Sequence, residues 1–458
     1  MSPFPLRTRA LRRVATAAAL VGALTLTRLT LEATAEPQTP APTTAAVGLA
    51  VDAAATFDAA WQAIHDTLAD DGQARSEWAK IRDEFRPRAA AARSDGELRE
   101  VLRDMLARLG RSHFDILPAT TSVSAARAGE DAVGDLGLEV TPIDGAPVVT
   151  RVLASGPAAS GGVRPGWVLE QISGEDPRQV VRAISGAGGN ERSGFRLWVT
   201  TVNLLRGPTG TRVPLAFRDM NGRQVDVTLT RASAEGDPVT LGHLPTLVAR
   251  LEQRRMQNPQ GHSVGYIHFN VWMTPLAAAI DRAVDAARGA VGLVVDLRQN
   301  PGGVLTMLMG VSGHFFEVPR TLGTLSTRDS ELKLVANPRL VSADGTRVAP
   351  FAGRVAIVVD ETSYSASEIF AGGMQAAGRA RVFGARTPGG ALPALMRQLP
   401  NGDVLEYAIG DFVTVAGRRI EGHGVVPDEL VRPSRAAIAA GHDPALDAAI
   451  RWAGGGAH

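Results

Sequence analysis

The chain has 458 residues, enough for about three domains of ordinary size. Hydrophobic residues make up 45% of it and charged residues 21%, which excludes a chain that is disordered throughout. The formal net charge of +1 argues against nucleic acid as the main partner. Cysteine is absent, which excludes disulfides, thiolate metal sites and a cysteine nucleophile. Lysine occurs only at Lys80 and Lys333, which narrows the choice of catalytic base.

The N-terminus has the pattern of an export signal. Four arginines between residues 7 and 13 precede an apolar stretch over 14–27, and Ala33-Thr34-Ala35 is a small-x-small cleavage pattern. Residues 1–35 are therefore predicted to be a signal peptide, with a disordered Pro/Thr/Ala-rich linker over 36–52. An uncleaved membrane anchor is the alternative, although the stretch is shorter than the roughly 20 residues that span a bilayer. The mature protein is expected in the periplasm, in the cell envelope or outside the cell.

Residues 53–118 are predicted to form an N-terminal helical segment. Phe57, Trp61, Ile64 and Leu68 recur at spacings of three and four, the pattern of an amphipathic helix. Two further helices follow the same rule, and the tripeptide 112–114 (Ser-His-Phe) comes directly after the third.

Residues 133–232 consist of short apolar runs separated by Gly, Pro and Asp turns, which predicts a small β-rich domain. The segments 134–138 and 156–169 resemble PDZ domains of bacterial proteases, although Trp167 stands where Asp is usual. This resemblance implies that an extended peptide binds at Leu136, Gly137 and Leu138 by strand addition. A glycine-rich hairpin without a ligand is the alternative, and 186–207 is interpreted as an insertion.

Residues 262–432 alternate strands and helices, so a layered α/β domain is expected over 240–455. The strand ending at Leu297 runs into Asn-Pro-Gly-Gly (300–303), whose glycines leave backbone N–H groups accessible to an oxyanion. The strand ending at Val359 leads to Ser365 at the start of a helix, where the N–H of Ala366 lacks an intrahelical partner. Taken singly, these features are also those of an ordinary turn and of a helix cap in which Ser365 pairs with Glu368.

Together, three motifs closely resemble the C-terminal processing and tricorn-core family of serine peptidases. They are Asp-Leu-Arg-x-Asn-Pro-Gly-Gly at 296–303, Ser-Ala-Ser-Glu-Ile-Phe-Ala-Gly at 365–372, and Gly-x-Gly-Val-x-Pro-Asp at 422–428. The resemblance covers residues 55–455 and implies an α/β fold: a crotonase-like (ββα) peptidase core, an N-terminal helical segment and an inserted PDZ-like β-rich domain. It also implies Ser365 as the nucleophile and an oxyanion hole from the backbone N–H groups of Gly302 or Gly303 and of Ala366.

The sequence departs from this family at the catalytic base. Processing peptidases use a lysine about twenty-five residues after the serine, and here Gly390 occupies that place, so a Ser-Lys dyad is not expected. The chain is similar to the tricorn branch instead, which implies His113 as base and Glu421 as the acid, linked through Ser112. His423 is the rival base. His268 and His314 are expected to be structural.

The sequence therefore predicts an exported serine endopeptidase with a Ser-His-Glu triad, acting on unstructured or C-terminal protein segments through an acyl-enzyme. The alternatives are a catalytically inactive peptide- or ligand-binding relative and an esterase, since the same triad cleaves esters. No metal, cofactor, nucleic acid or stable membrane span is predicted, and the oligomeric state stays open.

Overall fold

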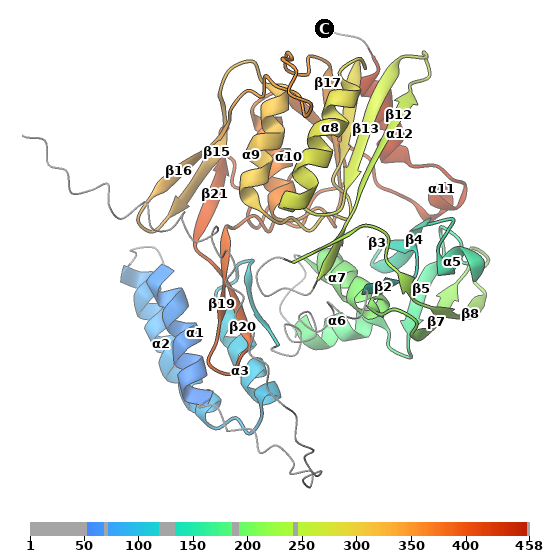
Figure 1. Cartoon of the computed structure of the whole chain (residues 1–458). Coiled ribbons are helices and arrows are strands. Elements are labelled where there is room, and N and C mark those ends of the chain that lie inside the picture. The colour runs from blue at the N-terminus through green and yellow to red at the C-terminus, as the bar shows by residue number, and fades with distance from the viewer. Residues whose placement is uncertain (1–52, 68–71, 119–132, 186–191, 241–245, 456–458) are drawn as a thin grey trace, which may run out of the picture. The chain divides into compact units, whose positions relative to one another are not determined.

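The computed structural model describes residues 53–67, 72–118, 133–185, 192–240 and 246–455 (Figure 1). The predicted signal peptide over 1–35 and linker over 36–52 lie outside these ranges. Among the helices that are described, none combines the length and the apolar character that crossing a bilayer requires.

The predicted N-terminal helices form and pack on a small sheet made largely by the C-terminal half of the chain. The helices are α1 (Ala53–Thr67), α2 (Gly72–Ala90) and α3 (Asp95–Ala107). The antiparallel sheet has the order β1 (Phe114–Leu117), β20 (Val404–Ala408) and β19 (Ala394–Gln398). Trp61 and Trp78 lie in their shared core, where each indole N–H donates to the backbone carbonyl of the other residue. This packing fixes the start of β1, which directly follows His113.

The second region is a five-stranded antiparallel sheet in the order β3-β4-β5-β7-β8. Its strands are β3 (Leu138–Ile143), β4 (Ala146–Val152), β5 (Val168–Ile172), β7 (Arg212–Arg218) and β8 (Gln224–Thr230). The short strands β2 (Val133–Asp135), β6 (Gly207–Pro208) and β9 (Ala232–Ser233) form a separate sheet. The helices are α5 (Pro157–Ser160), α6 (Pro177–Ser185) and α7 (Ser193–Leu205), and α7 packs along β3 through a core that includes Trp198. The predicted insertion over 186–207 therefore contains a core helix.

The third region is built on a six-stranded sheet in the order β12-β13-β14-β17-β18-β22. Its strands are β12 (Leu251–Gln257), β13 (Ser263–Phe269), β14 (Gly292–Asp296), β17 (Arg354–Val359), β18 (Ala380–Gly384) and β22 (Glu429–Leu430). All neighbouring pairs are parallel except β12 with β13. A hairpin, β10 (Asp237–Val239) with β11 (Leu247–Ala249), precedes it, and β15 (Arg320–Thr327), β16 (Glu331–Ala336) and β21 (Gly410–Thr414) form a side sheet.

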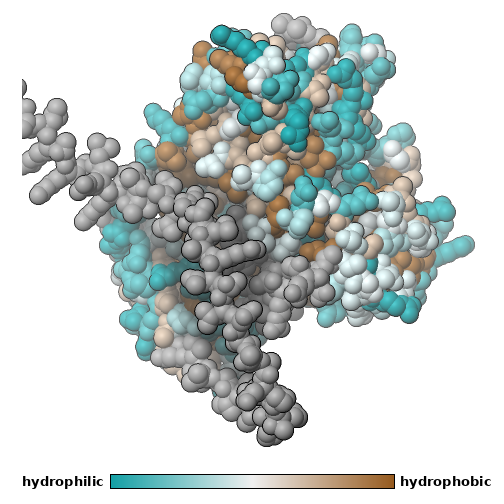
Figure 2. Space-filling view, in the orientation of Figure 1, coloured by the Kyte–Doolittle hydropathy of each residue, from teal (hydrophilic) through white to brown (hydrophobic). Residues whose placement is uncertain are grey.

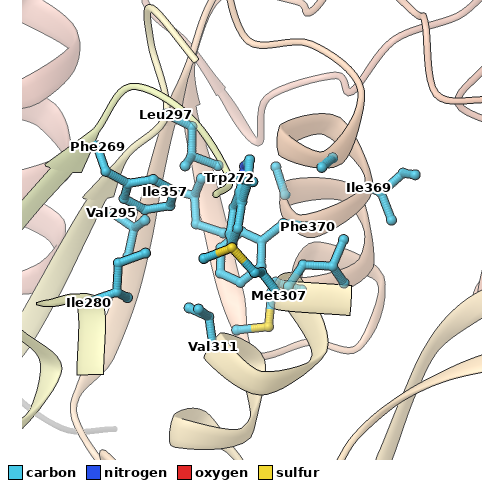
Figure 3. Close-up of a cluster of buried hydrophobic side chains, with 14 of the residues drawn as sticks. Phe269, Trp272, Ile280, Val295, Leu297, Met307, Val311, Ile357, Ile369 and Phe370 are labelled. Atoms are coloured by element: carbon cyan, nitrogen blue, oxygen red, sulfur yellow. The ribbon is translucent and has the colours of Figure 1, made fainter. Parts of the chain in front are cut away.

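Helices cover both faces of this sheet. The helices α8 (Ala277–Ala287), α9 (Leu305–Ser312) and α10 (Ala366–Ala376) share one apolar core with it, and Figure 3 shows Trp272, Met307 and Phe370 meeting there. The C-terminal helix α12 (Pro444–Ala453) packs on the other face, and α11 (Arg435–Ala439) precedes it. The predicted strands at 291–297 and 354–359 are confirmed as β14 and β17, and β14 is buried along its whole length. After the glycine turn, α9 ends at Ser312 and the chain continues as a 3₁₀ turn over Gly313–Phe315.

The surface is mixed in character. Figure 2 shows hydrophilic and hydrophobic residues side by side on one face. Exposed large apolar side chains, such as Val318, Leu332 and Leu430, lie on separate segments. What positions the candidate site is the parallel sheet, because β14 and β17 are neighbours and end at the same edge.

Candidate active site

Ser365 lies between the end of β17 and the first turn of α10, and its backbone is strained. Its φ of 56° and ψ of −117° fall in a region that non-glycine residues rarely adopt and that clusters at functional sites. The Ser365 N–H donates both to the carbonyl of Gly390 (3.1 Å) and to Glu368 Oε2 (3.1 Å). These bonds hold the serine in place at the N-terminus of the helix, so the helix-cap pairing of Ser365 with Glu368 coexists with the contact described next.

The structure brings His113 to Ser365, although 252 positions separate them along the chain. His113 Nε2 lies 3.2 Å from Ser365 Oγ. His113 also has a positive φ of 57°, directly before β1. Its ring stacks on Tyr364, with ring centroids 5.2 Å apart. The position of the imidazole is therefore fixed by an unusual backbone conformation and by stacking on the ring of Tyr364.

Ser112 and Glu421 continue this line of contacts. His113 Nδ1 lies 2.8 Å from Ser112 Oγ, and the Ser112 hydroxyl donates to Glu421 Oε2 at 2.7 Å. The Ser112 N–H also donates to Glu421 Oε1 at 2.8 Å. Because the Ser112 hydroxyl donates its hydrogen bond to the carboxylate, Ser112 Oγ is left to accept a hydrogen bond from Nδ1–H of His113. That tautomer presents an unprotonated Nε2 to Ser365.

Glu421 is buried, with 3% of its surface exposed, and two groups besides Ser112 donate to its carboxylate. The N–H of Ala391 donates to Oε2 at 3.0 Å, and Arg192 Nη2 donates to Oε1 at 3.0 Å. The side chain of Arg192 is itself only 14% exposed. Sequence reasoning missed Arg192, because a single arginine in a predicted insertion carries no recognisable signal.

The surroundings of His113 favour its neutral form. Burial, and then the positive charge of Arg192, lower the pKa of His113 from 6.5 to about 4. The ring is thus an acceptor at neutral pH, as a general base must be before it takes a proton.

The glycine turn after β14 lies against Ser365. A Cβ atom added to Gly302 would lie 2.7 Å from Ser365 Cβ and 3.0 Å from the backbone nitrogen of Ala366. Both glycines have positive φ, 101° at Gly302 and 138° at Gly303, so only glycine suits this close approach. Trp272 bridges the turn, donating its N–H to the Gly302 carbonyl (2.9 Å) and accepting the N–H of Val304 (2.7 Å).

The two glycines differ in how their N–H groups are used. The N–H of Gly302 donates to Asn300 Oδ1 at 3.0 Å within its own turn. Within the described ranges, the N–H groups of Gly303 and Ala366 have no hydrogen-bond partner. Of the three amides predicted for an oxyanion, Gly303 and Ala366 are therefore the ones left to donate.

Gly390, at the position of the family lysine, has no room for a side chain. A Cβ atom there would overlap the phenol ring of Tyr364, the residue before the candidate nucleophile. Glu368 fixes the segment around Gly390 by accepting the hydroxyl of Thr387 (2.5 Å) and the N–H groups of Gly389 (2.7 Å) and Gly390 (2.9 Å). Burial raises the pKa of Glu368 to about 7, and these donors oppose that rise. A lysine side chain at position 390 would thus clash with Tyr364, in line with the expectation that no Ser-Lys dyad operates here.

Gln299, which sequence reasoning also missed, ties the glycine turn to the β-rich sheet. Its φ is 60°, and its N–H donates to Thr362 Oγ1 at 2.6 Å. Its side-chain amide donates to the carbonyl of Val140 on β3 (2.8 Å) and accepts the indole N–H of Trp198 on α7 (2.7 Å). The turn that carries Gly302 and Gly303 is therefore anchored to two elements of another region.

The predicted peptide-binding loop is shaped by local bonds. Gly137 has a positive φ of 68°, and its N–H already donates to Asp135 Oδ1 at 2.8 Å. The Leu136 side chain is buried, with 2% of its surface exposed, and Leu138 begins β3. A peptide carboxylate at this loop would have to replace the Asp135 contact at Gly137.

The three other histidines considered in the sequence, at positions 268, 314 and 423, make other contacts. His314 is fully buried and bonds Asp281 through Nε2 (2.8 Å), and His268 Nδ1 contacts the carbonyl of Asp296 (3.2 Å). His423 is exposed, and its Nδ1 contacts the carbonyl of Glu421 rather than the carboxylate. Within the described residues, no group of three or more His, Asp or Glu side chains is arranged to hold a metal ion.

Comparison with known proteins finds two matching family models. The model of peptidase family S41 matches residues 263–431, and the model of the tricorn protease C1 domain matches residues 51–107. Residues 263–431 are thus similar to peptidase family S41, and this segment contains Ser365, both glycines and Glu421. The two matches confirm the predicted resemblance to the C-terminal processing and tricorn-core family.

Curated relatives are similar to this chain over about two thirds of its length. A protein of Staphylococcus haemolyticus described as a "Probable CtpA-like serine protease" is 26% identical over 307 residues, which are 66% of this chain and 54% of the relative. A protein of Staphylococcus aureus with the same description is 26% identical over 304 residues, 66% of this chain and 53% of the relative. The chain thus spans about half the length of the curated relatives it matches.

Solved structures share the fold. The photosystem II D1 C-terminal processing protease aligns with a TM-score of 0.57 and 22% identity, covering 88% of this chain and 97% of that one. Mature CPAF, solved in complex with lactacystin, aligns with a TM-score of 0.58 and 13% identity, covering 88% and 98% of the two chains. These matches support the mixed α/β fold of the chain.

Proposed function

We propose that this chain is an exported serine endopeptidase that uses Ser365 as nucleophile and His113 as base. One observation carries the proposal: an unbroken line of contacts runs from Ser365 Oγ through His113 and Ser112 to the Glu421 carboxylate. A serine hydroxyl at its free pKa is a weak nucleophile, and such a line supplies the base and holds the base in the required tautomer.

The chemistry follows from the positions of these groups. His113 Nε2 takes the proton of Ser365 as Oγ attacks a peptide carbonyl, and the N–H groups of Gly303 and Ala366 stabilise the oxyanion that forms. His113 then gives the proton to the leaving amine, which produces an acyl-enzyme, and the same base activates the water that hydrolyses it. Ser112 and Glu421 stabilise the imidazolium without touching the substrate. This assignment follows the tricorn branch of the family, with Gly390 in place of the lysine of processing peptidases.

The three regions of the fold receive roles in this proposal. Residues 240–455 act as a crotonase-like peptidase core, and 133–232 act as a PDZ-like domain that binds an extended segment along β3 near Leu136, Gly137 and Leu138. The helical segment over 53–118 supplies the base. A peptide on the edge of β3 competes with Gln299 at the Val140 carbonyl, so docking there exchanges an internal hydrogen bond for an intermolecular one.

The proposed substrates are unstructured or C-terminal segments of exported proteins. The active-site groups act on a peptide bond in an accessible strand, and strand addition on β3 needs an extended chain. Export rests on the arginines, apolar stretch and small-x-small pattern within residues 1–35.

Cleavage of casein by the full-length chain, with products identified by mass spectrometry, tests this function. The wild type is expected to cut, and Ser365→Ala and His113→Ala are expected to be inactive. His423→Ala, a change at an exposed histidine, is the matched control and should retain activity. If His113→Ala still cuts, the base is assigned wrongly. If none of the proteins cuts and the wild type still binds peptides, the chain is an inactive binding relative of its family.

A further inference from the structure

The helix α7 lies beside the candidate site, yet the mechanism above gives it no role. Arg192, at its N-cap, is followed at intervals of three by Phe195 and Trp198, so the three side chains share one face of the helix. Each contacts a different part of the site. The face defined by these three residues, called the α7 face below, belongs to the β-rich region and not to the peptidase core.

Arg192 contacts Glu421, the acid end of the line of contacts that runs from Ser365 through His113 and Ser112, called the relay below. Its Nη2 donates to Glu421 Oε1 at 3.0 Å and to the Gly389 carbonyl at 3.3 Å. The pair is well shielded, with 14% of the arginine side chain and 4% of the glutamate side chain exposed. In such a setting a carboxylate needs its partner charge, because an unpaired buried charge is strongly unfavourable.

Phe195 contacts the aromatic face that holds the base. Its ring stacks on Tyr364 with centroids 4.0 Å apart, and Tyr364 in turn stacks on His113 at 5.2 Å. Both pairs have an interplanar angle of 15°, so the three rings form one column. The column ends on the imidazole and includes the residue next to Ser365.

Trp198 contacts the loop of the oxyanion donors. Its indole N–H donates to Gln299 Oε1 at 2.7 Å, and Gln299 precedes Asn300. Asn300 in turn bonds to the glycine turn and to the loop of the nucleophile. Its Oδ1 accepts the Gly302 N–H, and its backbone carbonyl accepts the Tyr364 N–H at 3.1 Å.

We propose that the α7 face is a positioning element of the catalytic site, and that Arg192 is the positioning residue that orients Glu421. This inference rests on the proposed function, because it assigns a task to contacts with the proposed catalytic groups. It makes the peptidase site incomplete without the β-rich region, since the acid, the base and the oxyanion loop each rely on one side chain of the α7 face.

The groups around His113 determine the direction of the expected effect. Arg192, Glu421 and Tyr364 adjoin the ring and its relay, and Glu368 and Glu406 interact with Tyr364. On β20, burial and then its neighbour Asp115 on β1 raise the pKa of Glu406 to about 7. Removing Arg192 takes away a positive charge and leaves Glu421 uncompensated, and both changes favour the imidazolium.

Arg192→Gln tests the proposal, with Arg192→Lys as the conservative variant and Arg212→Gln, a change at an exposed arginine of β7 in the same region, as the matched control. The His113 pKa is measured by NMR on histidine-labelled full-length protein, with the signal assigned by its loss in His113→Gln. Steady-state kinetics on a casein-derived peptide give kcat and KM. Circular dichroism melting verifies that each variant folds.

Arg192→Gln is expected to raise the His113 pKa towards 6.5 and to lower kcat about 10- to 100-fold with little change in KM. Arg192→Lys should restore part of both, and Arg212→Gln should match the wild type. An unchanged His113 pKa and kcat in a folded Arg192→Gln protein would overturn the role of Arg192.

Trp198→Phe keeps an aromatic ring but loses the donor to Gln299, and it should lower kcat about threefold to tenfold without moving the His113 pKa. An unchanged kcat in this variant would overturn the role of the whole face. The NMR titration needs no turnover. If the wild type cleaves nothing, a shifted pKa still supports the positioning role while the peptidase proposal fails.

Discussion

The two halves of the proposed site are built in different ways. The nucleophile half, Ser365 with Gly302, Gly303 and Ala366, comes from two loops that follow the neighbouring parallel strands β14 and β17. The base half, His113 with Ser112, Glu421 and Arg192, comes from three segments of separate regions that meet only through packing. The carboxyl ends of parallel strands lie together at one edge of a sheet, so the first half needs little beyond the sheet itself.

This difference predicts different vulnerabilities. A change in the nucleophile half should disturb a tightly packed turn and therefore stability. A change in the base half should leave the fold intact and reduce the rate according to its place in the relay. Five measurements sharpen the comparison, in order of decreasing expected effect.

The largest effect is expected at the acid end of the relay. Glu421→Gln keeps the shape of the side chain but removes the charge that stabilises the imidazolium and pairs with Arg192. We expect kcat to fall by up to roughly 10⁴-fold, as when the acid of a serine triad is replaced by its amide. Steady-state kinetics with a fluorogenic peptide measure the loss, and a decrease of less than tenfold would remove Glu421 from the mechanism.

A smaller effect is expected at Ser112, which connects His113 to Glu421. Ser112→Ala removes the hydroxyl between His113 Nδ1 and Glu421 Oε2 but leaves the backbone N–H of residue 112 bonded to the carboxylate. A loss of kcat of about 10²-fold is expected, within the usual range for one proton-transfer partner. Ser155→Ala, a change at an exposed serine of the β-rich region, is the control. Equal rates for the two variants would mean that His113 and Glu421 do not communicate through Ser112.

The segment around Gly390, which packs against Tyr364 beside the nucleophile half, should respond in stability. Gly390→Ala places a methyl group against the ring of Tyr364 and should destabilise the fold by about 1–3 kcal/mol, the usual cost of overpacking a core. Thermal unfolding followed by circular dichroism measures this. The double variant Gly390→Ala, Tyr364→Leu should recover part of the loss. If Gly390→Ala melts like the wild type, the position is open and the steric account of the missing lysine is wrong.

The pH dependence of kcat/KM tests the environment of His113, the proposed base. The pKa of His113 is lowered to about 4, so the neutral, active form persists as pH falls below the usual histidine pKa of 6.5 and is lost only near pH 4. At pH 5 about nine-tenths of kcat/KM should remain, against about 3% for an ordinary histidine. A profile of kcat/KM between pH 4 and 8 reads this directly, and an acidic limb near 6.5 would show that the base is not buried beside Arg192.

The same depression implies a stability trend with a definite sign. The unfolded chain takes up a proton on His113 near pH 6.5, whereas the folded chain does so near pH 4. Between these values the unfolded state binds more protons, so stability falls as pH falls through this window and levels off below it. His113→Gln should flatten that part of the curve in chemical denaturation.

The sequence by itself determined the local parts of this protein. Strands β14 and β17, the glycine turn after the first and the serine at the start of α10 follow from runs of neighbouring residues, because apolar periodicity and turn residues act over short distances. The same locality made the motifs around Ser365 and Gly302 recognisable. His113, Ser112 and Glu421 were named from family resemblance, and their mutual contacts are a property of the folded chain.

Only the tertiary structure decided the rest. Arg192, Gln299 and Tyr364 carry no distinctive pattern, and their importance lies in which distant groups they meet. The choice between Gly302 and Gly303 likewise depends on Asn300, which takes up the Gly302 N–H. Such contacts depend on how helices and sheets dock, and docking is fixed by the sum of many weak packing terms that no short stretch of sequence contains.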